Sequence, residues 1–260
     1  MEVIILPSSK EVGALAADAI EDLVRSKPTA VLGLATGSSP LPIYDELARR
    51  HDEAGLSFTQ VHGFALDEYV GLPAGHFESY REVIRREFTN RVDVAAENVH
   101  GPDGTAADIL GACHAYEEAI KAAGGVDLQI LGVGTNGHIG FNEPGSSLAS
   151  RTRIKTLAEQ TRQDNSRFFD SIDQVPHHVV TQGLGTIMDA RHVVLVAVGA
   201  GKAQAIRDFV EGPVSAACPA SVLQFHPHVT IVIDEAAATR LAGADSYRHA
   251  FGNKPAWQGL

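Results

Sequence analysis

Short runs of apolar, mostly β-branched residues alternate along the chain with longer segments in which apolar residues recur three and four positions apart. The short runs predict buried strands, and the longer segments predict helices with one apolar face. Strands are expected at Val3–Leu6, Ala30–Ala35, Val61–Leu66, Leu128–Val133, His192–Val198 and Val229–Ile233. Helices are expected at Glu11–Arg25, Leu41–Arg50, Glu78–Phe88, Ala106–Ala122 and Lys202–Val210.

This regular alternation predicts the fold class. Strands that alternate with helices form a parallel sheet covered on both faces, so we expect a three-layer αβα, Rossmann-like α/β fold with a mostly parallel sheet. No linker, repeat or shift in composition divides the chain, and residues 1–260 are expected to form one domain. The stretch 156–182 is more polar and weakly patterned, which favours a lid or cover segment over core.

Composition and charge exclude several classes of protein. The formal net charge of −11 argues against general nucleic-acid binding, because phosphate backbones are bound by basic surfaces. No apolar run approaches the roughly 18 residues of a membrane span, and the start of the chain lacks the pattern of a signal peptide. The two cysteines, Cys113 and Cys218, are far apart and predict reduced thiols. We therefore expect a cytoplasmic protein that binds neither nucleic acid nor a membrane.

The segments after the predicted strands are the candidate site, because ligands of such folds bind at the carboxyl ends of the strands. The first is a loop that consists of Thr36, Gly37, Ser38 and Ser39. Pro40 suits the first position of the following helix, and Ser39 suits its N-cap. Gly37 would let a ligand approach the backbone, and the hydroxyls and free helix amides could hold a phosphate. The alternative is a capped turn without a ligand.

Two adjacent acids, Asp67 and Glu68, follow the strand Val61–Leu66. They could cap the next turn, or one of them could act as a general base. Successive side chains at a strand end point in different directions, so we expect only one of the two to reach a substrate.

The segment Gly132–Pro144, GVGTNGHIGFNEP, is the densest in candidate chemistry. It contains a formal G-x-G-x-x-G motif, but glycine and proline continue where that motif should open a helix, so dinucleotide binding is the weaker interpretation. A catalytic loop is the stronger one. His138 can transfer protons near neutral pH, Glu143 can orient the imidazole, and Asn136 can fix a hydroxyl or the imidazole without adding charge. A glycine-rich loop with a surface histidine is the alternative.

A second flexible turn, Gly199–Lys202, follows the strand His192–Val198 and opens a helix. Its lysine, Lys202, lies at the start of this helix, where it could contact a bound anion. A lone lysine in the first turn of a helix is more often a solvated surface charge. Lys202 is therefore a candidate ligand-binding residue only in combination with the other residues at the strand ends.

Together these segments resemble the glucosamine-6-phosphate deaminases, a family of sugar-phosphate isomerases and deaminases. The resemblance covers nearly the whole chain in family order, and LDEYVGLP and GHIGFNEP favour a deaminase over a general sugar-phosphate fold. The matching segments are Leu32–Pro40, Leu66–Pro73, Gly132–Pro144, Ser146–Leu157, Asn165–Asp170 and Gly183–Ala190.

The resemblance implies a reaction and a role for each residue. Glucosamine 6-phosphate and water would yield fructose 6-phosphate and ammonium, as a step of amino-sugar catabolism. Asp67 would move the proton from carbon 2 to carbon 1 of the open-chain sugar, and His138 would open the ring with Glu143 and Asn136 positioning it. The phosphate would be held by Thr36, Gly37, Ser38, Ser39, Arg167 and Lys202. No metal or other cofactor is expected, since no cluster of His, Cys and carboxylates has ligand spacing.

Position 136 departs from part of the family, because some members carry Asp there. An Asp would place a negative charge beside the imidazole, so the pH profile of a chain with Asn136 is expected to differ from theirs. Asparagine also occurs in the family, and activity is expected.

A second anion site is implied by the segment Ser146–Leu157. If this segment is extended, Arg151, Arg153 and Lys155 lie on one face of a strand, which is also typical of a charged edge strand. In some deaminases, matching residues bind the activator N-acetylglucosamine 6-phosphate between the subunits of a hexamer. The matching set here is Ser146, Arg153, Lys155 and Thr156. A homo-oligomer is therefore expected.

Two other functions fit parts of the sequence. A hydrolase similar to 6-phosphogluconolactonases would share the fold, but it would not need Asp67 for proton transfer at carbon. A non-catalytic sugar-phosphate sensor would usually carry a basic DNA-binding segment, whereas this chain is acidic and enters a strand almost at once.

Overall fold

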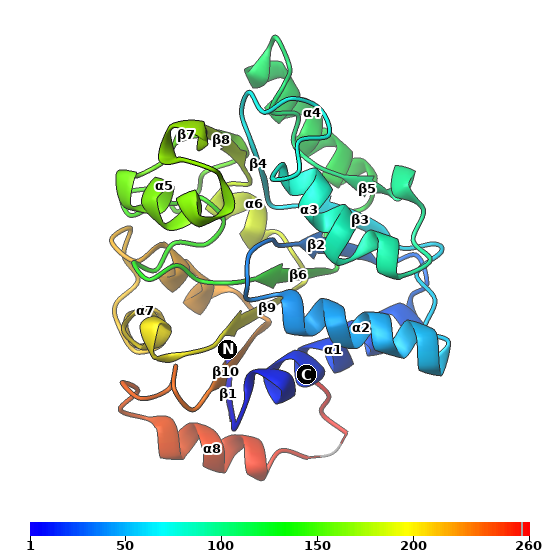
Figure 1. Cartoon of the computed structure of the whole chain (residues 1–260). Coiled ribbons are helices and arrows are strands. Elements are labelled where there is room, and N and C mark those ends of the chain that lie inside the picture. Colours follow the sequence, from blue (N-terminus) through cyan, green and yellow to red (C-terminus); the bar gives the residue numbers. More distant parts are fainter. Residues whose placement is uncertain (256) are drawn as a thin grey trace.

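A seven-stranded sheet forms the centre of the computed structural model, which describes residues 1–255 and 257–260 (Figure 1). All of its strand pairings are parallel, as the sequence predicted. In spatial order its strands are β1 (Glu2–Leu6), β10 (Val229–Asp234), β9 (His192–Ala197), β6 (Leu128–Leu131), β2 (Val31–Leu34), β3 (His62–Ala65) and β5 (Val99–His100).

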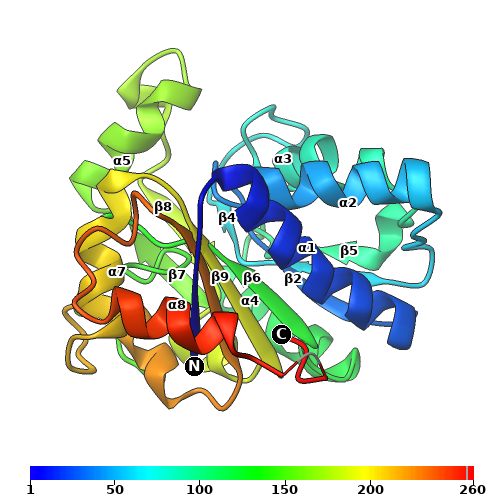
Figure 2. The same cartoon turned by 90° about the horizontal axis from the view of Figure 1, so that it is seen from below.

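Helices cover both faces of this sheet, which confirms the predicted three-layer α/β architecture. Figure 2 shows α1 and α2 on one side of the sheet and α7 and α8 on the other. The helices are α1 (Ser9–Ser26), α2 (Leu41–Ala54), α3 (Tyr80–Glu87), α4 (Ile109–Ala122), α5 (Glu159–Asn165), α6 (Leu184–Met188), α7 (Ala203–Val210) and α8 (Ala244–Gly252). Within the described part of the chain, none of them is long and apolar enough to cross a membrane.

Local sequence signals set the ends of the long helices. Ser8 caps α1: its hydroxyl accepts a hydrogen bond from the Glu11 amide and donates one to the Glu11 carboxylate. This arrangement satisfies free amides of the first turn. Helix α2 ends at Gly55, whose φ of 64° lies in the left-handed region that glycine adopts without strain.

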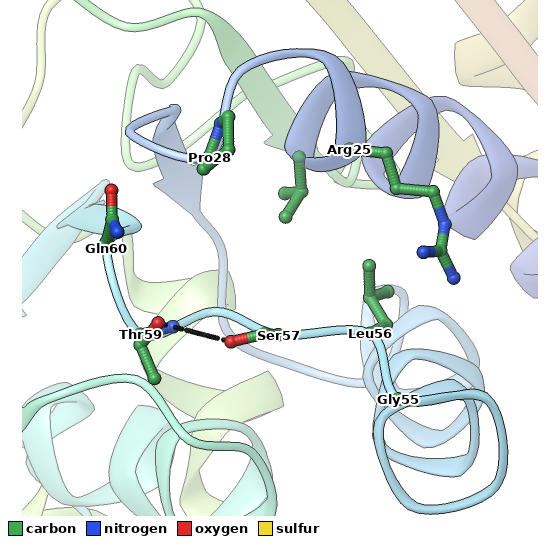
Figure 3. Close-up of a pocket in the computed structure, with 8 residues that line it drawn as sticks. Arg25, Pro28, Gly55, Leu56, Ser57, Thr59 and Gln60 are labelled. Atoms are coloured by element: carbon green, nitrogen blue, oxygen red, sulfur yellow. Dashed lines mark hydrogen bonds between the residues drawn. The ribbon is translucent and has the colours of Figure 1, made fainter.

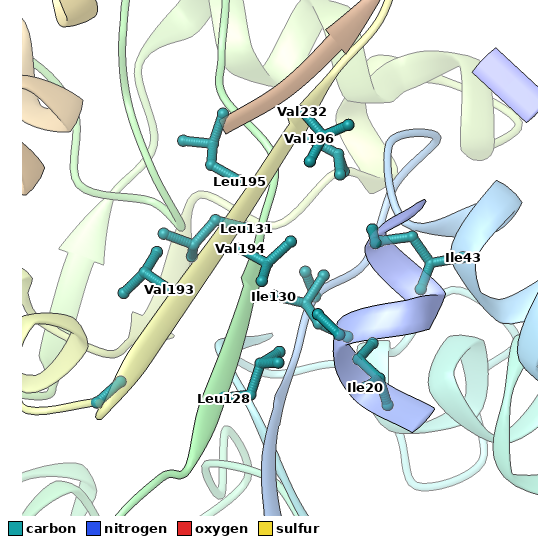
Figure 4. Close-up of a cluster of buried hydrophobic side chains, with 14 of the residues drawn as sticks. Ile20, Ile43, Leu128, Ile130, Leu131, Val193, Val194, Leu195, Val196 and Val232 are labelled. Carbon is teal, nitrogen blue, oxygen red and sulfur yellow. The ribbon is translucent and has the colours of Figure 1, made fainter. Parts of the chain in front are cut away.

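The central strands are buried from end to end. Every residue of β2, β6 and β9 is buried, as expected for parallel strands with helices on both faces. Figure 4 shows side chains of β6 and β9 packed together with Ile20 of α1 and Ile43 of α2. This core holds the strands in register and therefore fixes the positions of the loops that follow them.

A second, three-stranded sheet was not predicted. Its strands are antiparallel in the order β4 (Asp67–Tyr69), β8 (His178–Thr181) and β7 (Arg153–Thr156). They are only three or four residues long, and only β7 was marked in the sequence, by its alternating cations. A small apolar cluster packs beside this sheet and includes Tyr69, Phe141, Leu157 and Val179.

The predicted starts of α2 and α4 differ from the observed ones. Pro40, not Ser39, takes the N-cap position of α2, and no side chain caps that helix. Helix α4 begins at Ile109 rather than Ala106, because the Asp108 carboxylate accepts a hydrogen bond from the Gly111 amide and sets the start of the helix there.

The strand order places a switch point between β2 and β6. From β2 the chain continues outward to β3 and β5, whereas β6 begins a run in the other direction through β9 and β10. Crossovers on either side of such a point leave a crevice at the carboxyl ends of the strands. The loops after β2, β6 and β9 meet there.

The buried core predicts a large effect for Ile130→Ala in β6. Ile130 is fully buried, so removing its side chain should lower the free energy of unfolding by about 2–5 kcal/mol through lost burial and a residual cavity. Urea unfolding measures this change. Leu110→Ala is the matched control, because Leu110 is 65% exposed and its truncation should change stability by less than about 0.5 kcal/mol. Similar losses for the two variants would contradict the assignment of the core.

Candidate active site

The candidate site is built from three neighbouring loops at the carboxyl edge of the large sheet. The loop after β6 lies between the loops after β2 and β9, because β6 pairs with both of those strands. Ser39 of the β2 loop packs against the β6 loop so closely that a Cβ at Gly132 would lie 3.1 Å from the Ser39 hydroxyl oxygen. Gly132 therefore permits the close approach of the two loops.

Asp67 faces the β6 loop from the first residue of β4. It is 5% exposed, and a Cβ at Gly140 would lie 3.5 Å from its Oδ2. No described group hydrogen-bonds its carboxylate. Burial, with a smaller contribution from the negative charge of Glu68, raises the pKa of Asp67 well above its ordinary value. A carboxylate in this state is a stronger base than a solvated one.

Glu68 points away from this position and has a structural role. Its carboxylate accepts hydrogen bonds from the backbone amides of Tyr69, Tyr80 and Arg81 at 2.8–2.9 Å. Two of these amides belong to the first turn of α3, where a carboxylate is stabilised by the free N–H groups. The two acids therefore point in different directions, and Asp67 is the one that faces the β6 loop.

His138, Asn136 and Glu143 form a hydrogen-bonded chain in the β6 loop. The Asn136 Nδ2 donates to Glu143 Oε2 at 2.7 Å, and the Asn136 Oδ1 lies 2.7 Å from His138 Nδ1. A carboxylate only accepts, so the amide must present its NH₂ to Glu143 and its oxygen to the imidazole. His138 Nδ1 then carries a proton, and Nε2 is the nitrogen left to exchange protons with a ligand.

Glu143 is ionised in this environment. Its burial would raise the pKa, but the nearby imidazole of His138 and the hydrogen bonds from Thr161 and Asn136 outweigh that effect and lower the pKa of Glu143 to about 2. Its Oε2 also lies 3.6 Å from His138 Nδ1. A fixed negative charge at this distance favours the protonated imidazole during proton transfer.

Two glycines allow the loop to take this shape. The imidazole of His138 lies over Gly134, where a Cβ would approach ring atoms to 2.2–2.4 Å. Gly137 has a φ of 82°, and a Cβ there would lie 2.5 Å from the Cys218 sulfur. Side chains at these two positions would displace the imidazole or the segment around Cys218 that braces the loop.

Arg167 and Lys202 lie close enough for their charges to interact. Burial is the main cause that lowers the pKa of Lys202, and the positive charge of Arg167 lowers it further, whereas Asp164 opposes the shift. Neither cation forms an ion pair with any described residue. Two unpaired cations near each other at a loop edge suit an anion such as phosphate.

The Thr36–Ser39 loop is also free to bind a ligand. No hydrogen bond to another described residue engages the hydroxyls of Thr36, Ser38 or Ser39. Gly37 is exposed and has a φ of 87°, and the 14-residue helix α2 begins just beyond the loop. Free amides near the start of a helix favour an anion.

The residues of the predicted second site lie on and beside β7. Arg153 and Lys155 are half-buried on this edge strand, Thr156 is exposed, and the buried Ser146 hydroxyl has no partner among the described residues. Arg151 does not belong to this set, because it precedes the strand and forms ion pairs with Glu117 and Asp189. The prediction of three cations on one strand face was wrong in that respect.

Sequence reasoning missed Thr161 and the tyrosines around Asp67. Thr161, in α5, donates a hydrogen bond to Glu143 Oε1. The Tyr69 hydroxyl accepts from Asn165 at 2.9 Å, and the ring of Tyr80 packs on Tyr69 at 4.8 Å. For Thr161 the only signal was the polar character of the stretch 156–182, whereas Tyr69 lies within the segment LDEYVGLP but was given no role.

A surface hollow of about 380 Å³ lies elsewhere on the molecule (Figure 3). It is lined by residues such as Pro28, Leu56 and Gln60, which precede β2 and β3, so it lies at the amino edge of the sheet. None of its lining side chains is suited to proton transfer near neutral pH. We therefore place the candidate active site at the opposite edge.

The fold and these groups define an α/β protein with acid–base and anion-binding groups at one sheet edge. Residues 8–232 match the family described as glucosamine-6-phosphate isomerases/6-phosphogluconolactonase. The chain belongs to this family. It is 75% identical to a glucosamine-6-phosphate deaminase of Arthrobacter sp. (strain FB24), over the full length of both chains.

Two solved structures represent the two kinds of enzyme that the family description names. A structure described as a monomeric glucosamine-6-phosphate deaminase is 42% identical, has a TM-score of 0.90, and matches 92% of this chain and 100% of its own. A 6-phosphogluconolactonase from Trypanosoma cruzi is 21% identical with a TM-score of 0.74, and the match covers 93% of this chain and 97% of the lactonase. At this level of identity, the resemblance to the lactonase shows a shared fold alone.

The ionised state of Glu143 predicts a pH-dependent contribution to stability. Its pKa is about 2 in the folded chain against an ordinary value of 4.5, so its contribution is complete above about pH 5 and disappears as the pH falls toward 2. The difference in free energy of unfolding between the native chain and Glu143→Gln should therefore narrow by up to about 3 kcal/mol over this interval. Urea unfolding at several pH values measures it. A difference that does not vary with pH would contradict the ionised state.

Proposed function

We propose that the chain catalyses the hydrolytic deamination and isomerisation of glucosamine 6-phosphate to fructose 6-phosphate and ammonium. The observation that carries this proposal is the buried carboxylate of Asp67, which no described group hydrogen-bonds, facing the loop of His138, Asn136 and Glu143. A base for a carbon-bound proton and a separate proton carrier are the two groups that this reaction needs. The names of the relatives support the same activity.

His138 opens the sugar ring in the proposed mechanism. Its Nε2 takes the proton of the carbon-1 hydroxyl and returns a proton to the ring oxygen, which yields the open-chain aldehyde. Asn136 holds Nδ1, and Glu143 stabilises the positive charge that develops on the imidazole.

Asp67 then transfers a proton between two carbons. Its carboxylate removes the proton from carbon 2, which is acidified by the neighbouring aldehyde. The substrate's own ammonium group gives a proton to the aldehyde oxygen, and an enolamine forms. Return of that proton to carbon 1 gives the imine of the ketose. Water adds to the imine carbon, and the nitrogen leaves as ammonium, so that the products are fructose 6-phosphate and ammonium.

The phosphate is not changed and serves to align the sugar. Thr36–Ser39 offers amides and hydroxyls, and Arg167 and Lys202 offer positive charge. Binding energy from this remote group can be used to place carbon 2 at Asp67. All chemical steps are assigned to side chains of the chain itself.

Two rival functions are less well supported. A lactonase would have no use for a buried base such as Asp67 directed at a carbon-bound proton. The lactonase structures are 21–22% identical to this chain, so they show a shared fold alone. A non-catalytic sensor would not need the hydrogen-bonded chain from Glu143 to His138. The proposed reaction belongs to amino-sugar catabolism, for which we infer a cytoplasmic location.

Regulation by a second sugar phosphate is also proposed. Arg153 and Lys155 make no ion pair with any described residue, and the amide of Ser146 donates to the Glu143 carbonyl at 3.0 Å. A ligand bound at Ser146, Arg153, Lys155 and Thr156 would thus contact the turn that carries Glu143. The proposed ligand is N-acetylglucosamine 6-phosphate, and the proposed assembly is a homo-oligomer such as a hexamer, although a 42%-identical relative is described as monomeric.

The reaction is tested by following fructose 6-phosphate and ammonium together after adding glucosamine 6-phosphate in the presence of a chelator. We expect equal amounts of both products. Asp67→Asn should lower kcat by about 10²–10⁴, because the amide cannot accept the carbon-bound proton. Glu118→Gln, an exposed change on α4, is the control and should leave kcat unchanged. Binding of the sugar phosphate without either product would instead favour the lactonase or the sensor.

Regulation is tested by kinetics with and without N-acetylglucosamine 6-phosphate. We expect sigmoidal dependence on glucosamine 6-phosphate that becomes hyperbolic when the acetylated sugar is added, and loss of this response in Arg153→Ala. Arg151→Ala is the matched control for charge on this segment. Hyperbolic kinetics that the acetylated sugar does not alter would contradict the second site.

A further inference from the structure

The carboxylate of Glu143 is held from two sides. Its Oε2 accepts from Asn136 Nδ2 at 2.7 Å and thereby faces His138. Its Oε1 accepts from the hydroxyl of Thr161, which lies 18 positions further along the chain in α5. Glu143 is 8% exposed and Thr161 is 6% exposed, so water offers little replacement for either bond.

The Thr161 hydroxyl determines how this carboxylate is oriented. A carboxylate can rotate about its terminal bond, and only hydrogen bonds to both oxygens fix its plane. Without the Thr161 bond, Oε1 would be left buried without its donor, and the group would be free to turn toward other donors such as the imidazole. The Asn136 bridge to His138 would then lose its fixed geometry.

Thr161 belongs to a segment with further contacts around the cleft. Asn165, one turn later, donates to the Tyr69 hydroxyl at 2.9 Å, and Phe169 packs edge-on against the Tyr69 ring at 5.7 Å. The same segment carries Arg167, which lies near Lys202. A single short stretch of chain therefore contacts the Glu143 carboxylate, the strand of Asp67 and the proposed phosphate site.

We propose that Thr161 is a positioning residue that orients Glu143, and through Asn136 the imidazole of His138, from the segment that also carries Arg167. This inference rests on the proposed function, because it assumes that His138 opens the ring. It gives the stretch 156–182 a role beyond covering the cleft: the proton relay is completed only when α5 is docked.

The test compares Thr161→Val with Thr161→Ser in the full chain, using glucosamine 6-phosphate as substrate. Valine keeps the branched shape but removes the hydroxyl, so kcat should fall about tenfold or more, with a smaller change in KM. Serine keeps the hydroxyl and should retain kcat within about threefold. Gln160→Ala is the matched control, since Gln160 is exposed and its side chain hydrogen-bonds Asp164 and no other described residue.

A double-mutant cycle with His138→Asn separates positioning from general destabilisation. If Thr161 acts through His138, then Thr161→Val should have no further effect on kcat in the His138→Asn background. An equal loss of kcat in both backgrounds, or failure of serine to restore it, would overturn the proposal. If His138→Asn alone keeps the native kcat, the proposed ring-opening role fails; if it is impaired while Thr161→Val is not, only the role of Thr161 fails.

Discussion

The parallel pairing of β6 with β2 on one side and β9 on the other is the constraint on which the site depends. It forces the three loops that follow these strands to one edge, although their residues are separated by up to about 165 positions in the chain. Close contact between Ser39 and Gly132 then fits two of these loops together. The buried core of β6 and β9 keeps this edge rigid, which is what proton transfer at fixed distances needs.

The small antiparallel sheet adds the groups that the large sheet does not supply. Strand β4 presents Asp67 to the β6 loop, and its partner β8 presents Thr181, whose hydroxyl accepts from the Phe141 amide at 3.1 Å. The connection between β7 and β8 contains α5 and brings Thr161 to Glu143. The second sheet and its connections thus supply Asp67 and Thr161, whereas the β6 loop of the large sheet supplies His138, Asn136 and Glu143.

The sequence allowed the large sheet and the strand-end candidates to be predicted, but not the second sheet or Thr161. Strands such as β6 and β9 are mostly apolar and buried throughout, and the glycine-rich loop after β6 is distinctive. By contrast, the alternating cations around β7 indicated an edge strand, but nothing in the sequence marks β4 and β8 as its sheet. The bond from Thr161 to Glu143 spans 18 positions and depends on how α5 docks, which no local pattern encodes. Register within short, polar strands is set by tertiary packing.

Two buried carboxylates illustrate how the environment assigns different chemistry to similar groups. Burial alone would raise the pKa of both Asp67 and Glu143. Asp67 has a neighbouring negative charge and no described hydrogen-bond donor, so its pKa is raised, which suits a base that must take a proton from carbon. Glu143 is surrounded by His138, Thr161 and Asn136, so it stays ionised, which suits a group that stabilises a protonated imidazole. The hydrogen-bond donors supplied by the β6 loop and α5, rather than the depth of burial, therefore separate the two roles.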